Sequence, residues 1–225
     1  MQRSLILAAP FVLAVPVVLG LVIVFAGHPL DAGALAVGAV GWAFALALRA
    51  PVALIGQRLL HGNPERTQRA VVLSSGPLEE LVRLAVVLLV GRDLSTALWI
   101  GLGWAAIEVL FSIVNGFALA QLEKRTDEEA ERARAMLPPQ ALSAGAPWWG
   151  VIERIWASLL HIAFTLIVAA APLTAPINAV VHSAVNVAAL AGARRYPLAA
   201  VSVGGLLLAL ALLAVGLLLH GALAG

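Results

Sequence analysis

Two neighbouring glutamates and an arginine lie inside an otherwise apolar run of the sequence. The segment Ser-Ser-Gly-Pro-Leu-Glu-Glu-Leu-Val-Arg contains Glu79, Glu80 and Arg83. Ionisable side chains at membrane depth are costly, so they are kept where they pair, face a cavity or serve a function. Arg83 lies one helical turn beyond both glutamates and can pair with one, leaving the other for a cavity. Two such carboxylates can hold different protonation states, as acid–base catalysis requires.

Other polar side chains occur at similar depth in three later apolar runs. They are Glu108 in the run 94–120, His161 in the run 151–171, and His182 and Asn186 in the run 173–192. His182 and Asn186 are four residues apart, so they share one face of a helix. Each of these side chains alone is explained by a hydrogen bond between helices. Their common depth with the Glu79–Arg83 group favours one shared site, and we expect Glu79 or Glu80, Glu108, His161 and His182 to line a single polar cavity.

Glu79, His161 and His182 are suited to activating water in either of two ways. In the first, Glu79 is the general base and Glu80 is the partner of Arg83. The histidines then orient the water or donate to the developing oxyanion, and the Asn186 amide can donate as well. In the second, the same three residues bind zinc, which takes water as its fourth ligand. The chain has no cysteine, so any metal ligands must be histidines and carboxylates. The sequence leaves both mechanisms open.

The composition predicts that these residues are carried by membrane-spanning helices. Hydrophobic residues make up 62% of the 225-residue chain and charged residues 12%, whereas soluble domains carry about 25% charged residues. A helix crosses the bilayer with about 20 apolar residues. Suitable runs cover residues 4–26, 32–57, 69–90, 94–120, 151–171, 173–192 and 197–220. We therefore expect an all-α, polytopic membrane bundle of about seven transmembrane helices, forming one domain over residues 1–225.

Basic residues in alternate loops predict the orientation in the cell membrane. Clusters occur at Arg3, around 58–69, within the polar insertion 121–150 and at 194–195, while the opposite loops offer only Arg92. The positive-inside rule therefore predicts a cytoplasmic N-terminus and an external C-terminus. The net charge is only +2, so nothing in the sequence suggests nucleic-acid binding.

Pro77 and Arg49 lead to two further expectations. Pro77 cannot donate to the carbonyl four residues before it, so we expect the helix to break or kink near Gly76 and a half-helix to begin at Pro77. Arg49 lies near the predicted cytoplasmic end of its run, where a long side chain can reach the interface, and we expect it outside the site.

The order of these motifs resembles the YhfC family of intramembrane proteases. The resemblance covers residues 69–192: Glu-Glu-x-x-Arg, then Glu108, then His161, then His-x-x-x-Asn. That family belongs to a superfamily with the type II CAAX prenyl proteases, the PrsW proteases and the seven-span scaffold subunit of gamma-secretase. In the CAAX enzymes the first glutamate of the pair activates water, and the histidines and asparagine assist the water and the oxyanion. The resemblance implies these roles for Glu79, His182 and Asn186.

The chain departs from the CAAX enzymes at two points. It has two residues between the glutamate pair and the arginine, where those enzymes have three, and it has Glu108 where they use a histidine. Both departures favour the YhfC family and argue against prenylated substrates.

The residues and the resemblance together predict an intramembrane endopeptidase that acts through a glutamate-activated water, or through zinc in the metal-dependent variant. Its expected partners are membrane lipids and a membrane-protein or peptide substrate. Glutamate and histidine at mid-depth are also typical of a proton-coupled transporter or channel. Small-residue helix faces are typical of a non-catalytic scaffold. The sequence leaves these two alternatives open.

Overall fold

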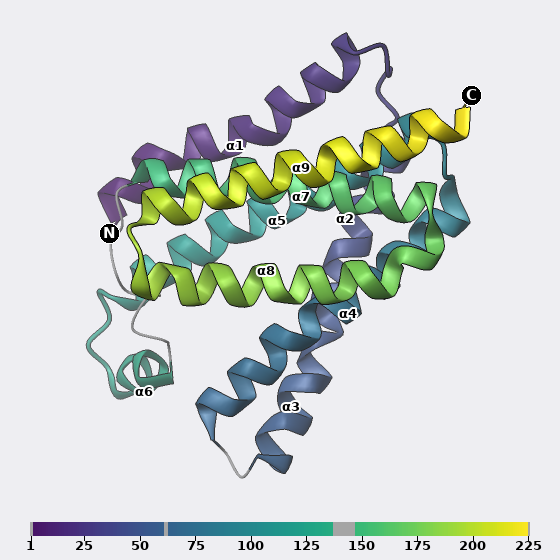
Figure 1. Cartoon of the computed structure of the whole chain (residues 1–225). Helices are drawn as coiled ribbons and strands as arrows, with labels where there is room; N and C mark the ends of the chain where they lie inside the picture. Colours follow the sequence, from purple (N-terminus) through teal and green to yellow (C-terminus); the bar gives the residue numbers. More distant parts are fainter. Residues whose placement is uncertain (1, 61–62, 137–146, 225) are drawn as a thin grey trace.

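The structure is a computed structural model that describes residues 2–60, 63–136 and 147–224, and every regular element in those ranges is a helix. Figure 1 shows long helices packed side by side in a bundle. They are α1 (Gln2–Phe25), α2 (Ala32–Ala47), α3 (Arg49–Leu59), α4 (Pro64–Val90), α5 (Leu94–Leu122), α6 (Glu128–Met136), α7 (Pro147–Ala170), α8 (Ala175–Arg195) and α9 (Leu198–Ala224), with a short 3₁₀ turn at Pro172–Thr174 before α8. The predicted all-α bundle is confirmed.

Most of these helices have the length and the apolar surface of membrane spans. Among the described residues, six stretches are long and apolar enough to cross a membrane, with α2 and α3 counted as one. The seventh long helix, α4, has 27 residues and carries the charges of the site. Large apolar side chains such as Phe25, Leu89 and Leu218 stay exposed on the outside of the bundle. A surface of this kind is suited to lipid rather than water.

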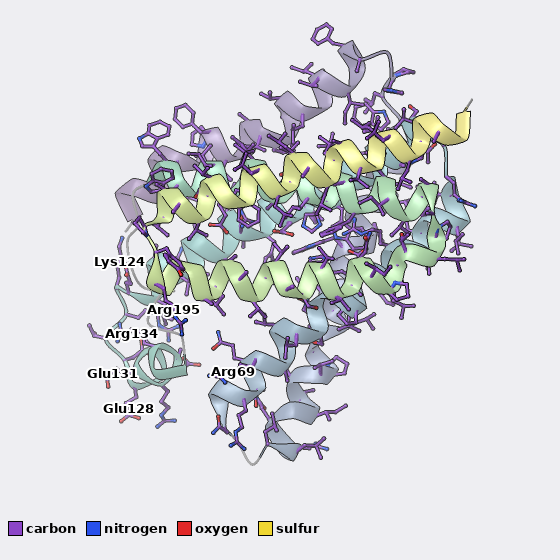
Figure 2. The ribbon with its side chains drawn as sticks, in the orientation of Figure 1. Arg69, Lys124, Glu128, Glu131, Arg134 and Arg195 are labelled. Atoms are coloured by element: carbon purple, nitrogen blue, oxygen red, sulfur yellow. The ribbon has the colours of Figure 1, made fainter. Side chains whose placement is uncertain are left out.

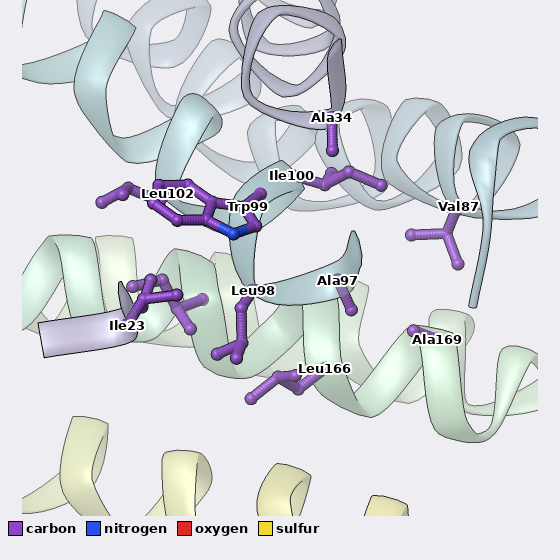
Figure 3. Packing of buried hydrophobic residues seen from close by; sticks show 11 residues of the cluster. Ile23, Ala34, Val87, Ala97, Leu98, Trp99, Ile100, Leu102, Leu166 and Ala169 are labelled. Atoms are coloured by element: carbon purple, nitrogen blue, oxygen red, sulfur yellow. The ribbon is translucent and has the colours of Figure 1, made fainter. Parts of the chain in front are cut away.

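Helices α5 and α7 form the centre of the bundle because small residues let their neighbours approach closely. A Cβ atom at Gly101 would lie 2.7 Å from the Cα of Ile162 in α7, and one at Gly103 would lie 1.9 Å from the carbonyl oxygen of Leu35 in α2. Figure 3 shows part of an apolar cluster in which residues of α5, such as Ile100, lie beside residues of α7, such as Leu166. The cluster includes Ala97 near the start of α5 and Ala169 near the end of α7.

The second predicted span is not one helix. Helix α2 ends at Ala47 and α3 begins at Arg49. Pro51 explains the break, because it cannot donate to the carbonyl of Ala47 and its ring collides with that carbonyl. Together with the first half of α4, α3 leans away from the main bundle (Figure 1). As a result Arg49 lies at a junction between two helices rather than at a helix end.

The expectation of a break at Pro77 is wrong, because α4 is continuous from Pro64 to Val90. No half-helix begins at Pro77. The carbonyl of Leu73, which loses its donor to Pro77, accepts a hydrogen bond from Ser183 in α8 (2.8 Å). Side chains of neighbouring helices can satisfy a carbonyl freed in this way, so a proline is tolerated within a membrane helix.

The predicted polar insertion contains α6, and its residues 137–146 lie outside the described residues. Asp127 begins this helix by accepting from the backbone N–H of Ala130 at 3.0 Å. Hydrogen bonds from Arg125 lower the pKa of the Asp127 carboxyl to about 2. Figure 2 shows Lys124, Arg134 and Arg195 at the same end of the bundle. Basic side chains from separate loops thus gather at one end.

Candidate active site

Glu80, Arg83 and His182 form the buried floor of the site. Arg83 lies one turn after Glu80 on α4, and its Nε donates to both oxygens of the Glu80 carboxylate at 3.1 Å. The Nδ1 atom of His182 in α8 lies 2.9 Å from Oε1 of Glu80. A carboxylate bound in this way accepts, so the His182 proton is on Nδ1. Its Nε2 therefore faces Glu79, 3.7 Å from that residue's Oε1.

Arg83 is completely buried, and the bundle compensates its charge on several sides. Its Nη1 donates to the Thr165 hydroxyl at 2.6 Å and to the His161 carbonyl at 3.2 Å. Its guanidinium carbon lies 4.2 Å from the centre of the Trp104 ring, a cation–π contact. The predicted pairing of Arg83 with Glu80 is therefore confirmed. Because three helices contribute to it, this arrangement fixes α4 against α5 and α7.

Glu79 is not the free carboxylate that the sequence predicts. One of its oxygens, Oε1, pairs with the guanidinium of Arg49 at the start of α3. The other, Oε2, accepts from the Trp104 indole at 3.0 Å and lies 4.0 Å from Arg83. The expectation that Arg49 lies outside the site is wrong, because the α2–α3 break directs its side chain inward. Glu79 is therefore held in place by donors from three helices.

His161 is fixed by partners at both ring nitrogens. Its Nδ1 lies 3.2 Å from Nη2 of Arg83. Because arginine can only donate, Nδ1 accepts and the proton is on Nε2. That nitrogen lies 2.5 Å from Oε2 of Glu108. The other oxygen of Glu108 accepts from Arg154 at 2.8 Å. Glu108 thus holds His161 in one tautomer, and Arg154 holds Glu108.

Asn186 lies on the same side of α8 as His182, as predicted, but it contacts another partner. Its amide nitrogen donates to the hydroxyl of Ser75 at 2.9 Å. Ser75 in turn donates to the Val72 carbonyl at 2.7 Å. Among the described residues, Asn186 has no recorded hydrogen bond to the glutamates or histidines of the site.

A cavity of about 970 Å³ joins these residues. Glu79, Glu108, His161, His182 and Asn186 all line it. The predicted convergence of four spans on one polar cavity is therefore confirmed as geometry. The catalytic roles of the residues stay predictions.

Glu80 and Arg83 lie behind the cavity wall rather than in it. From the site, the cavity extends toward the end of the bundle where α1, α7 and α9 begin, past residues such as Trp149 and Leu198. The apolar cluster of α5 and α7, drawn in Figure 3, includes Ala97 near the start of α5 and Ala169 near the end of α7. Among the described residues, those that line the cavity reach only the end where α1, α7 and α9 begin, so the cavity is one-sided and the site lies at its inner end.

Two arginine side chains oppose the binding of a metal ion at this site. Ligand atoms of Glu79, His161 and His182 lie within 4.8 Å of one another, which is close enough to hold one ion. However, Arg83 donates to His161, and Arg49 pairs with Glu79. Two guanidinium groups in contact with the ligands oppose the binding of a further cation. As arranged, the residues do not fit zinc unless these arginines move.

Three members of the network were missed from the sequence. Trp104 lies four residues before Glu108, so the two share a face of α5, and this spacing was the available signal. Arg154 lies seven residues before His161, so the two share a face of α7, and this spacing was the available signal. Arg49 had no sequence signal, because its direction depends on the bend between α2 and α3.

Comparisons with protein-family models, with curated proteins and with solved structures found no match to this chain. The site's chemistry must therefore be argued from its own geometry.

Proposed function

We propose that this protein is an intramembrane endopeptidase in which Glu79 activates a water molecule against a peptide bond. One observation carries the proposal. Glu79, His161 and His182 converge at the inner end of a one-sided cavity that is large enough for a segment of polypeptide. Such a site combines a carboxylate base, positioned histidines and protection from bulk water.

The spacing of the three residues suits a water molecule. Because their ligand atoms lie within 4.8 Å of one another, a single point lies within about 2.8 Å of all three, a normal hydrogen-bond distance. A water at that point would hydrogen-bond Glu79 and Nε2 of His182, while His161, whose ring nitrogens bind Arg83 and Glu108, lies beside it. A water oxygen at that point attacks the peptide carbonyl carbon while its proton passes to Glu79. The tetrahedral intermediate then collapses, the C–N bond breaks, and Glu79 returns the proton to the amine that leaves.

The remaining residues position this group. Glu80 holds the Nδ1–H of His182, so that the lone pair of Nε2 faces the water. Arg83 neutralises Glu80 and donates to His161. Glu108 fixes the tautomer of His161 from the other side. Each of these positioning residues forms an ion pair or a hydrogen bond with a charged side chain. These interactions keep the side chains of the site in their geometry.

The transporter alternative is less well supported by this geometry. A transporter needs a water route that reaches both faces in alternate states, whereas an apolar cluster that includes Ile100 and Leu166 lies beyond the site. A silent scaffold would not require a carboxylate and two histidines on a cavity wall.

The motif order and the basic loops also bear on the protein's family, its orientation in the membrane and its substrate. The motif order supports membership in the YhfC family. The basic loops support a cytoplasmic placement for the end where α1, α7 and α9 begin, so the cavity would open toward the cytoplasm. Its substrate would be a peptide segment of a membrane-associated protein that enters from that side or from the lipid.

Replacing Glu79 by Gln tests the proposal. The purified wild type and Glu79→Gln are placed in lipid nanodiscs with a library of peptides and single-span membrane segments, and cleavage is followed by mass spectrometry. The substitution keeps the shape of the side chain but removes the base, so cleavage should be lost. Glu131→Gln, which removes an exposed carboxylate on α6, is the control and should cleave normally.

Two results would contradict the peptidase. Cleavage by Glu79→Gln at the wild-type rate would exclude the glutamate mechanism. Absence of cleavage of every substrate, together with proton flux into liposomes that requires Glu79 and His182, would establish the transporter instead.

A further inference from the structure

Peptide hydrolysis needs a donor for the oxyanion, and the side chains predicted for that task have other partners. The proton of His182 is on Nδ1, where Glu80 accepts it. The proton of His161 is on Nε2, where Glu108 accepts it. The amide of Asn186 donates to Ser75. As arranged, these side chains offer the substrate oxygen no well-placed donor.

Arg49 has the position and the spare donor that the oxyanion needs. It lines the cavity, and its side chain keeps 24% exposure, compared with 2% for Glu79. Its Nη2 pairs with Oε1 of Glu79, while its Nε is buried and has no hydrogen-bond acceptor among the described residues. Because Nε is enclosed by protein, a substrate oxygen can reach only the other donors of the guanidinium. An arginine has five N–H donors, so the pair with Glu79 leaves donors available for a second oxygen.

We infer that Arg49 is a catalytic residue that binds the developing oxyanion of the substrate, a role that rests on the proposed function. The π electrons of the peptide carbonyl move onto its oxygen as the water oxygen bonds to carbon and the water proton passes to Glu79. Negative charge thus leaves Glu79 and appears on the substrate oxygen in the same step. Arg49 already lies beside Glu79, so its charge is next to both positions and little rearrangement is required.

The junction between α2 and α3 supports this role. Arg49 is the first residue of α3, which leans away from the main bundle with the first half of α4 (Figure 1). Arg83, by contrast, is enclosed and bound on several sides. Of the two guanidinium groups that approach Glu79, only that of Arg49 reaches the cavity. A substrate that enters the cavity therefore meets Arg49 rather than Arg83.

The kinetic test compares Arg49→Gln and Arg49→Lys with the control Arg58→Gln in the same helix. Arg58 is exposed at the end of α3 and outside the cavity. On a peptide that the wild type cleaves, Arg49→Gln should lower kcat about 100- to 1,000-fold, as expected for loss of an oxyanion donor. KM should change little, because the interaction forms in the transition state. Arg49→Lys should recover part of the rate, and Arg58→Gln should match the wild type.

A binding test separates oxyanion binding from an effect exerted through Glu79. The probes are a peptidyl phosphinate, whose anionic tetrahedral centre resembles the intermediate, and the uncleaved peptide of the same sequence. In the Glu79→Gln background, a further Arg49→Gln substitution should weaken phosphinate binding at least about tenfold and leave peptide binding unchanged. If the second substitution had no effect on the phosphinate, Arg49 would act only on Glu79 and the inference would be wrong. Equal weakening of both probes would also overturn it.

Failure of this inference is distinguishable from failure of the proposed function. A wild type that cleaves peptides, with an Arg49→Gln variant that retains kcat, refutes only the role of Arg49. A wild type that cleaves nothing refutes both.

Discussion

The hydroxyl of Ser183 in α8 donates to the carbonyl of Leu73 in α4 at 2.8 Å, and this is the carbonyl that Pro77 leaves without a donor. The two helices cross here closely, because a Cβ atom at Gly76 would lie 2.3 Å from the Ala179 carbonyl oxygen. One residue before Ser183, His182 binds Glu80. The same contact region therefore packs α4 on α8 and positions His182 against Glu80.

Replacing Ser183 by Ala should destabilise the protein by about 1–3 kcal/mol, because the Leu73 carbonyl loses the donor that takes the place of the missing backbone N–H. The free energy of unfolding can be measured in bicelles by steric trapping. Ser74→Ala is the matched control. Ser74 donates to the Val71 carbonyl within its own helix, and that carbonyl keeps its backbone donor, so little change is expected. Equal stability of Ser183→Ala and the wild type would contradict the pairing.

Pro77→Ala should rescue Ser183→Ala. Alanine restores a backbone N–H to the Leu73 carbonyl, so the effects of the two substitutions should be non-additive, and the double variant should be more stable than Ser183→Ala alone. Simple addition of the two effects would show that Ser183 stabilises the protein in another way.

Gly76→Ala should cost about 1–3 kcal/mol of stability, because the added methyl group collides with backbone atoms of α8 and forces the helices apart. It should also reduce cleavage, since the 2.9 Å contact between His182 and Glu80 depends on the same crossing. Gly204→Ala in α9 is the control, because a Cβ atom there meets no atom within 4 Å. Thermal unfolding and cleavage rates of the two variants can be compared directly. If both behaved alike, the crossing would not be close-packed.

Arg83→Gln should destabilise the fold by about 3–5 kcal/mol, because it leaves the buried Glu80 carboxylate without its cation. Adding Glu80→Gln should restore much of the stability but no activity, since His182 would lose the carboxylate that orients it. Arg132→Gln, whose partner Glu128 is exposed on α6, should leave the unfolding midpoint unchanged. A stable and active Arg83→Gln variant would refute the structural role of this ion pair.

Chelators should leave cleavage unaffected. Arg83 and Arg49 occupy the ligands that a zinc ion would need, so activity should continue at the same rate after dialysis against EDTA or 1,10-phenanthroline. Elemental analysis of the purified protein provides a second readout. Stoichiometric zinc whose removal stops cleavage would show that the arginines move aside for an ion.

Cysteine labelling can test the predicted orientation without interference, because the chain contains no cysteine. Leu30→Cys in the loop between α1 and α2 should react with an impermeant maleimide in intact cells. Lys124→Cys, after α5, should react only after the membrane is opened, because its basic loop is predicted to be cytoplasmic. The reverse pattern would invert the topology and open the cavity to the outside.

Local features of the sequence were sufficient to predict most of the helices. Span length and hydropathy are properties of contiguous residues, so the runs that became α1, α5, α7 and α9 were found within a few residues of their bounds. Asp31 is of a residue type that often caps helices, and its carboxylate accepts from the backbone N–H of Ala34 at the start of α2 at 2.9 Å. The depth of Glu79, His161 and His182 also followed from their distance to the span ends. Side chains that lie at equal depth and face the centre of the bundle are brought close together.

Only the tertiary structure decided how these residues are paired. Pro51 bends the second span and directs Arg49 onto Glu79, while Ser183 allows α4 to continue through Pro77. Both outcomes depend on side chains contributed by other helices, which the spacing along a single helix cannot specify. That Glu79 rather than Glu80 lines the cavity has the same origin, because adjacent residues on a helix differ in direction by about 100° and packing decides which of the two buried side chains faces the cavity.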